Sequence, residues 1–315
     1  MNRRSTIGSR RSRCVAIATA VLLSTAAEAH AALTEASRLA AIYDLILDAR
    51  FDRVDAQVER ACPPAPKEAC SALASVSLYW QILLDPDNKQ LDGRFNERAA
   101  AAITASEAWT KREPRSAEAW FYLAGSYAPL VQWRVLRGQR LSAAREGQKA
   151  KDALERTLQL DPTLDDAYFG IGLYHYYADV VPAAAKILRF LLLLPGGDRV
   201  QGLSEMLQAR QKGVLLKGEA DYQLHLIYLW YEHQPARAID LLNDLDSRYG
   251  YNPLFLQRRA EVQSKYLHDR SGSASTWQTL LDRARAGRVY DARRVEDRAR
   301  RELTALERIS TESLN

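Results

Sequence analysis

Two histidine–carboxylate pairs have the spacing that comes closest to metal or acid–base chemistry. His175 with Asp179, and Asp221 with His225, each stand four residues apart, which places both side chains on one face of a helix. A zinc site needs three or four protein ligands, and the sequence marks no further ligand for either pair. It also contains no nucleophile elbow, phosphate-binding loop, dinucleotide-binding glycine motif or zinc-protease motif. We therefore expect these histidines to pack between helices, with no catalytic residue, no metal and no cofactor.

Residues 1–31 have the three-part pattern of an export signal. Five arginines are followed by an apolar run from Cys14 to Thr25 and then by two overlapping A-x-A cleavage sites, which end at Ala29 and Ala31. The apolar run is too short for a membrane-spanning helix, which needs about 20 residues. We expect the general secretory route to export the chain to the periplasm and to remove residues 1–31.

Removal of this signal changes the charge of the protein. The signal holds five of the 44 basic residues and one of the 39 acidic residues, which leaves 39 and 38 in the mature chain. Proteins that bind nucleic acids neutralise phosphates with an excess of lysine and arginine. A mature chain so close to neutrality does not favour a nucleic-acid partner.

Two cysteines remain after cleavage, and they enclose a short proline-rich loop. Cys62 and Cys70 are separated by seven residues, three of which are prolines. In an oxidising compartment such a pair usually forms a disulfide. A reactive or metal-binding pair is the alternative, but neither a C-x-x-C spacing nor a nearby histidine supports it. We predict a structural disulfide.

Helical periodicity dominates the remaining chain. Apolar residues recur at spacings of three and four, as in Leu39, Ile42, Ile46 and Ala49, and each set forms one stripe of a helix. Prolines and glycines interrupt these stripes at short intervals. We predict an all-α fold of about fourteen helices with short connections, and one continuous domain over residues 32–315.

Signature residues of one helical repeat family occur in the middle of the chain. Trp120, Leu123, Ala124 and Tyr127 have the W-x2-L-[GA]-x2-Y spacing of the first helix of a tetratricopeptide repeat, and a following unit begins at Tyr168. The chain therefore resembles the tetratricopeptide superfamily, most clearly over residues 116–180 and more weakly over 217–255. About fourteen residues are inserted between Trp120 and Pro162, and residues 182–213 show no repeat pattern.

The resemblance implies a right-handed α-solenoid of antiparallel helix pairs, here with irregular inserted helices. In such folds the first helix of each unit lines a concave groove. The family register places eight mostly aromatic residues in that groove: Phe121, Phe169, Leu173, Tyr176, Tyr177, Ile227, Trp230 and Tyr231. The opposing interpretation is that the helices of residues 182–213 fold over this face and bury it.

Two further segments have a structural and a functional interpretation. In Pro195-Gly196-Gly197-Asp198, the glycines fit the end of one helix and Asp198 fits the N-cap of the next. The functional alternative is an anion- or partner-binding corner formed by Asp198 and Arg199. The apolar run 187–194 is expected to be a buried helix, with peripheral contact to a membrane surface as its alternative.

These observations favour an exported scaffold that binds a protein or peptide through an aromatic groove. Two other classes stay open. One is a helical protein of the cell envelope that binds an apolar small molecule or lipid in a cavity between residues 168–194 and 222–231. The other, less favoured, is an enzyme that uses His175 or His225.

The signal-peptide interpretation predicts a mature N-terminus at or near Ala32, because the second A-x-A site ends at Ala31. Sequencing of the N-terminus of the exported protein measures this directly. Retention of residues 1–25 in the exported form would contradict the prediction. The chain would then keep its positive net charge, and a nucleic-acid partner would again be a candidate.

Overall fold

The computed structural model describes residues 33–180 and 196–312, with side chains up to residue 308. All regular structure in these residues is α-helical, which confirms the predicted all-α class. The first seven helices are α1 (Ala36–Leu47), α2 (Phe51–Ala61), α3 (Lys67–Leu84), α4 (Asp92–Arg112), α5 (Ala117–Leu136), α6 (Arg140–Leu160) and α7 (Ala167–Val180). They are followed by α9 (Arg199–Lys212), α10 (Lys217–Trp230), α11 (Pro235–Arg248), α12 (Pro253–Lys265), α13 (Arg270–Arg285) and α14 (Ala292–Glu312).

Helix boundaries follow the capping residues of the sequence. Ser116 caps α5 by accepting a hydrogen bond from the Ala119 amide at 3.1 Å, and Asn252 caps α12 by accepting one from Leu254 at 3.0 Å. These polar side chains satisfy amide groups that have no partner inside the helix. The residues inserted relative to the repeat pattern do not form a loop. They lengthen α5, which continues through Pro129, and α6.

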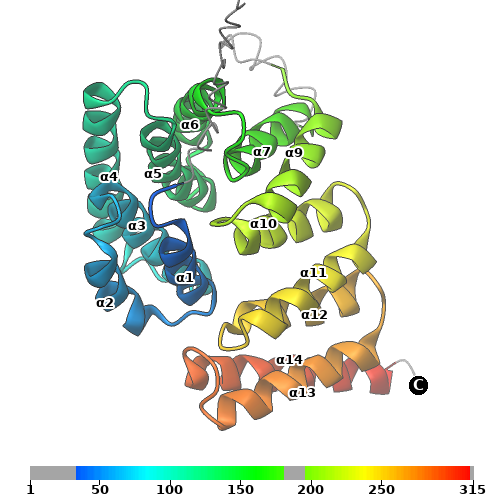
Figure 1. Ribbon diagram of the computed structural model, residues 1–315. Helices are drawn as coiled ribbons and strands as arrows, with labels where there is room; N and C mark the ends of the chain where they lie inside the picture. Colours follow the sequence, from blue (N-terminus) through cyan, green and yellow to red (C-terminus); the bar gives the residue numbers. More distant parts are fainter. Residues whose placement is uncertain (1–32, 181–195, 313–315) are drawn as a thin grey trace, which may run out of the picture. The chain divides into compact units, whose positions relative to one another are not determined.

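Most helices pack against their neighbours in the chain. Successive pairs from α1–α2 to α13–α14 are in contact, and α3 also contacts both α1 and α5 (Figure 1). Residues from α1 to α12 share one hydrophobic core, and α12, α13 and α14 enclose a second, smaller one. None of the described helices is long and apolar enough to span a membrane. The apolar run 187–194 lies outside the described residues.

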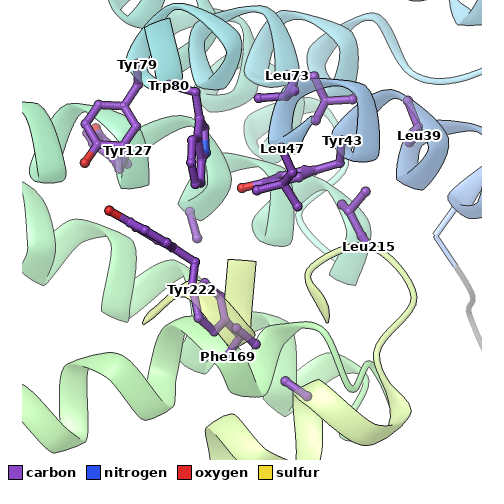
Figure 2. Packing of buried hydrophobic residues seen from close by; sticks show 14 of the residues in the cluster. Leu39, Tyr43, Leu47, Leu73, Tyr79, Trp80, Tyr127, Phe169, Leu215 and Tyr222 are labelled. Carbon is purple, nitrogen blue, oxygen red and sulfur yellow. The ribbon is translucent and has the colours of Figure 1, made fainter. Parts of the chain in front are cut away.

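Helix α10 is the element whose packing departs from this sequential order. It contacts α1, which lies far away in the sequence, and its Tyr222 ring lies 4.9 Å from the Trp80 ring of α3. Figure 2 shows Tyr222 extending toward Trp80, with Phe169 of α7 close by. Helix α10 is therefore built into the main core, against helices from the first third of the chain.

A buried carboxylate holds α10 in this position. Glu219 is 3% exposed and accepts hydrogen bonds from the Tyr43 hydroxyl at 3.1 Å, the Trp80 indole at 3.3 Å and the Gln223 amide at 3.1 Å. Burial raises the pKa of Glu219 above its ordinary value, and these donors oppose that rise. The carboxylate thereby joins α1, α3 and α10.

A second buried carboxylate fixes the start of the same helix. Asp166, just before α7, accepts hydrogen bonds from the amides of Val214, Leu215 and Leu216 at 2.8–3.0 Å. These amides immediately precede α10, so one side chain satisfies the donors at the helix entrance. At the other end of the array, the turn before α12 is tied to α1 by Asn252, whose amide donates to the Leu47 carbonyl at 2.7 Å.

The predicted disulfide is confirmed. Cys62 and Cys70 are bonded, with their Cα atoms 6.5 Å apart, and the bridge closes the proline-rich loop between α2 and α3. In the chain-entropy model a loop of this size contributes roughly 2.5 kcal/mol to stability. The bridge therefore stabilises the connection between α2 and α3.

Replacement of Glu219 tests whether this carboxylate organises the core. Glu219→Ala leaves three buried donors without an acceptor, at a cost of about 1–3 kcal/mol each, whereas Glu219→Gln keeps one acceptor oxygen and the shape of the side chain. We expect urea unfolding at pH 7 to give a loss of about 3 kcal/mol or more for the alanine variant and a smaller loss for the glutamine variant. Glu97→Ala, on the exposed face of α4, is the control. Equal stability of the Glu219→Ala and Glu97→Ala variants would contradict the assignment.

Candidate functional site

Three tyrosines from two helices meet where α7 and α10 end. The rings of Tyr176, Tyr177 and Tyr231 lie 5.6–6.0 Å apart and are nearly perpendicular to one another. Edge-to-face contacts of this kind stabilise aromatic clusters beyond the area that they bury. The structure thus brings together three of the eight residues predicted for the groove.

Glu232 connects this aromatic cluster to the start of α9. Its carboxylate accepts hydrogen bonds from the Arg199 guanidinium at 2.8 and 2.6 Å and from the Tyr176 hydroxyl at 2.5 Å. The bonds from Arg199 lower the pKa of Glu232, so the carboxylate is charged at neutral pH. Burial and the bond to Glu232 raise the pKa of the Tyr176 phenol, which keeps it neutral. We call Tyr177, Arg199, Trp230, Tyr231 and Glu232 the corner patch.

Close packing of α7 on α9 places Arg199 at this corner. A Cβ atom on Gly172 would lie 2.7 Å from the Gly202 carbonyl oxygen, so only glycine allows the two helices to approach so closely. Asp198 caps α9 by accepting a hydrogen bond from the Gln201 amide at 2.9 Å, as the capping interpretation predicted. Arg199, the residue of the alternative binding interpretation, directly follows this capping residue.

The predicted groove residues divide into a buried and an accessible group. Phe121, Phe169, Tyr176 and Ile227 are at most 6% exposed and belong to the main core. Trp230 is 46% exposed, and Leu173, Tyr177 and Tyr231 are partly buried.

Tertiary packing, which the repeat register does not describe, explains why four of the predicted groove residues are buried. Helix α10 packs against α1 and, through Tyr222, against Trp80 of α3, so its own Ile227 lies in the main core. The described part of 182–213, helix α9, also packs on α7. The four buried side chains are therefore core residues here, and they leave no open groove at their positions. Only the accessible group is available to a partner.

The histidine–carboxylate pairs of the sequence do not form metal sites among the described residues. The His175 Nδ1 atom lies 2.8 Å from Glu205 of α9, and Asp221 pairs with Arg210 and Arg248 instead of His225. His225 is fully buried, its Nδ1–H donates to the Tyr222 carbonyl, and its Nε2 atom has no hydrogen-bond partner. Desolvation lowers the pKa of His225 to about 3.

One open hollow was not anticipated as a site. It has a volume of about 550 Å³ and lies between α5 and α6, with Trp120, Leu123 and Tyr127 on one side. The rest of its lining is mostly charged and consists of Glu107 of α4 and of Lys149, Asp152, Ala153, Glu155, Arg156 and Gln159 of α6. The Lys149 ammonium lies 5.5 Å from the centre of the Tyr127 ring, a cation–π distance. The repeat signature did mark these three α5 residues, but as packing positions. We call this feature the α5–α6 hollow.

Comparison with known proteins does not assign the chain to a family. No family model matches it, and no curated protein matches its sequence. The tetratricopeptide resemblance therefore stays a prediction that rests on its motif residues. The corner patch and the α5–α6 hollow are the features on which a function can be proposed.

The buried imidazole of His225 predicts a specific pH dependence of stability. The pKa of His225 is lower in the folded chain than its value of 6.5 in the unfolded chain. As the pH falls below 6.5, the unfolded chain therefore binds a proton that the folded chain does not, and the free energy of unfolding decreases. Between pH 7 and pH 5 this effect amounts to about 2 kcal/mol. We expect urea unfolding to show this loss for the wild type and to show it reduced by that amount in His225→Phe.

His268→Asn is the matched control, because His268 is exposed and its left-handed backbone conformation tolerates asparagine. It should keep the pH dependence of the wild type. The same pH dependence in the wild type and in His225→Phe would contradict a neutral, buried histidine at this position.

Proposed function

We propose that the chain is an exported helical scaffold that binds a partner protein or peptide through the corner patch. The observation that carries this proposal is the exposure of Trp230, a large aromatic side chain at the end of α10, beside the partly buried Tyr177 and Tyr231 and the Arg199–Glu232 ion pair. Trp, Tyr and Arg are the side chains most enriched where binding energy concentrates in protein interfaces.

Exposed apolar surface next to the patch supports the same proposal. Val200 directly follows Arg199 and is 80% exposed at the start of α9. Single exposed apolar side chains are common on protein surfaces. A group of aromatic and apolar side chains beside a charged pair has instead the composition of an interface, with an apolar centre and a polar rim. The patch is also anchored by α7, α9 and α10, so a partner would meet a surface that is already ordered.

A tetratricopeptide-like solenoid is the architecture that we propose behind this surface. Contacts between consecutive helices, together with those of α1 with α3, α3 with α5 and α5 with α7, support an array of antiparallel pairs. Helix α10 would then be the departure from a regular array, because it occupies the face that such proteins leave open. Binding would shift from the concave face to the corner.

Periplasmic location is proposed from two independent features. The N-terminal pattern of residues 1–31 predicts export, and the Cys62–Cys70 disulfide is typical of proteins that reside in an oxidising compartment.

A second candidate function is the binding of an apolar small molecule or lipid. The α5–α6 hollow favours it, because a volume of about 550 Å³ lies in the range of small-molecule sites and Trp120, Leu123 and Tyr127 form an apolar wall. This places the ligand at a different position from the cavity expected between residues 168–194 and 222–231. Native mass spectrometry of the purified mature chain tests for a co-purifying ligand.

Truncation of Trp230 tests the scaffold proposal. Loss of an interface anchor costs about 2 kcal/mol or more, a loss of about thirtyfold in affinity, while an exposed side chain contributes little to stability. We expect Trp230→Ala to lose a partner that the immobilised wild type retains from an envelope extract of its native host, with an almost unchanged melting temperature.

Tyr266→Ala is the matched control, because Tyr266 is 45% exposed at the equivalent end of α12. It should retain the partner. The proposal fails if both variants retain the same partners as the wild type, or if Trp230→Ala alone lowers the melting temperature strongly, since the ring would then be part of the core.

A further inference from the structure

A second, smaller hollow is formed by residues 51–98 together with Tyr290, none of which belongs to the corner patch. It has a volume of about 310 Å³ and is enclosed by α2, α3, α4 and the segment before α14. Phe51 of α2 and Tyr290 close one end, with their rings 5.1 Å apart and perpendicular. We call it the α2–α4 hollow. Its volume is at the lower end of the range for small-molecule sites.

Charges of opposite sign line this hollow on different helices. Asp52 and Asp55 stand three residues apart on α2, and Arg94 and Arg98 stand four apart on α4, so each pair shares one helix face. In the described part of the chain, none of these four side chains forms an ion pair or a hydrogen bond. All four side chains are exposed. Elsewhere in the described chain some arginines are paired, as Arg283 is with Asp246 at 2.6 Å, and others, such as the exposed Arg53, are not. The hollow thus contains two anions and two cations that do not satisfy one another.

A serine hydroxyl in the hollow adds a further observation. Ser77 of α3 lines the hollow and is only 5% exposed, yet its hydroxyl has no hydrogen-bond partner among the described residues. The other buried serines of α3 to α5 are partnered: Ser75 donates to the Ala72 carbonyl at 2.8 Å, and Ser106 pairs with Ser126 at 3.0 Å. The Ser77 oxygen is not among the enclosed side-chain atoms of the described chain that lack a partner, so it keeps some accessible surface. It can accept or donate a hydrogen bond to a molecule in the hollow.

The arrangement of charge selects the class of that molecule. Two arginines match a carboxylate, which they can hold by parallel N–H···O bonds, and two aspartates match an ammonium group. A ligand with a single charge would gain from one helix and be repelled by the other. A ligand with both charges at its two ends matches both.

Size and apolar lining narrow the class further. A hollow of about 310 Å³ accepts an amino acid or a dipeptide but not a lipid. Leu78, Phe51 and Tyr290 supply apolar contacts for a side chain between the charged ends. We propose that the α2–α4 hollow binds a zwitterionic amino acid or short peptide, with its carboxylate on Arg94 and Arg98 and its ammonium group on Asp52 and Asp55.

The test measures binding to the mature chain, by isothermal titration calorimetry, for four probes. L-leucine and L-leucyl-L-leucine carry both charges and differ in length, N-acetyl-L-leucine carries only the carboxylate, and L-leucinamide carries only the ammonium group. We expect saturable binding of at least one zwitterion and affinity lower by about tenfold or more for both singly charged probes, because each lacks one set of charge-assisted hydrogen bonds.

Variants then assign each charged end to its helix. Arg98→Gln should weaken zwitterion binding but leave leucinamide binding unchanged, and Asp55→Asn should weaken zwitterion binding but leave N-acetyl-leucine binding unchanged. Arg53→Gln, an exposed arginine of α2 that does not line the hollow, should bind like the wild type. All replaced residues are exposed, so melting temperatures should stay constant.

Three outcomes would overturn the proposal. The first is the absence of saturable binding by either zwitterion at millimolar concentration. The second is equal binding of a zwitterion and one singly charged probe, which would show a simple ion site. The third is equal binding by the wild type, Arg98→Gln and Asp55→Asn, which would place the ligand elsewhere.

Discussion

The position of Glu219 is the constraint on which the main core depends. Its buried carboxylate accepts hydrogen bonds from Tyr43 of α1 and Trp80 of α3, and it lies on α10, about 140 residues beyond Trp80 in the chain. A buried acceptor with three donors allows only one register of these helices, because any shift leaves polar groups without partners in an apolar environment. Apolar contacts such as Trp80 with Tyr222 stabilise the arrangement, but they are less specific about register.

The placement of α10 also decides which aromatic residues can meet a partner. Phe121, Phe169 and Ile227 lie in the main core, to which α10 also contributes. The aromatic side chains near the C-terminal ends of α7 and α10 stay accessible, and Arg199 and Glu232 lie beside them.

Paired and unpaired charges distinguish structural from functional polar groups in this protein. Asp166 and Asp221 are buried and fully engaged with backbone amides or arginines, which makes them part of the scaffold. Asp55 and Arg98, in contrast, line one hollow and find no partner within the described chain. Folding stability explains the first kind of charge. Both residues are exposed, and the ligand that we propose would give a role to their position around one hollow.

The sequence by itself determined the helical class, several helix ends and the disulfide. Periodicity, capping residues such as Ser116 and Asn252, and the spacing of Cys62 and Cys70 are local features, and local chemistry decides their structure. The interior or surface position of each aromatic residue could not be read in this way. A repeat register specifies which helix face a residue occupies, but only tertiary packing specifies what covers that face. Helix α10 joins the main core through contacts between residues more than a hundred positions apart, and such contacts leave no periodic signal in the chain.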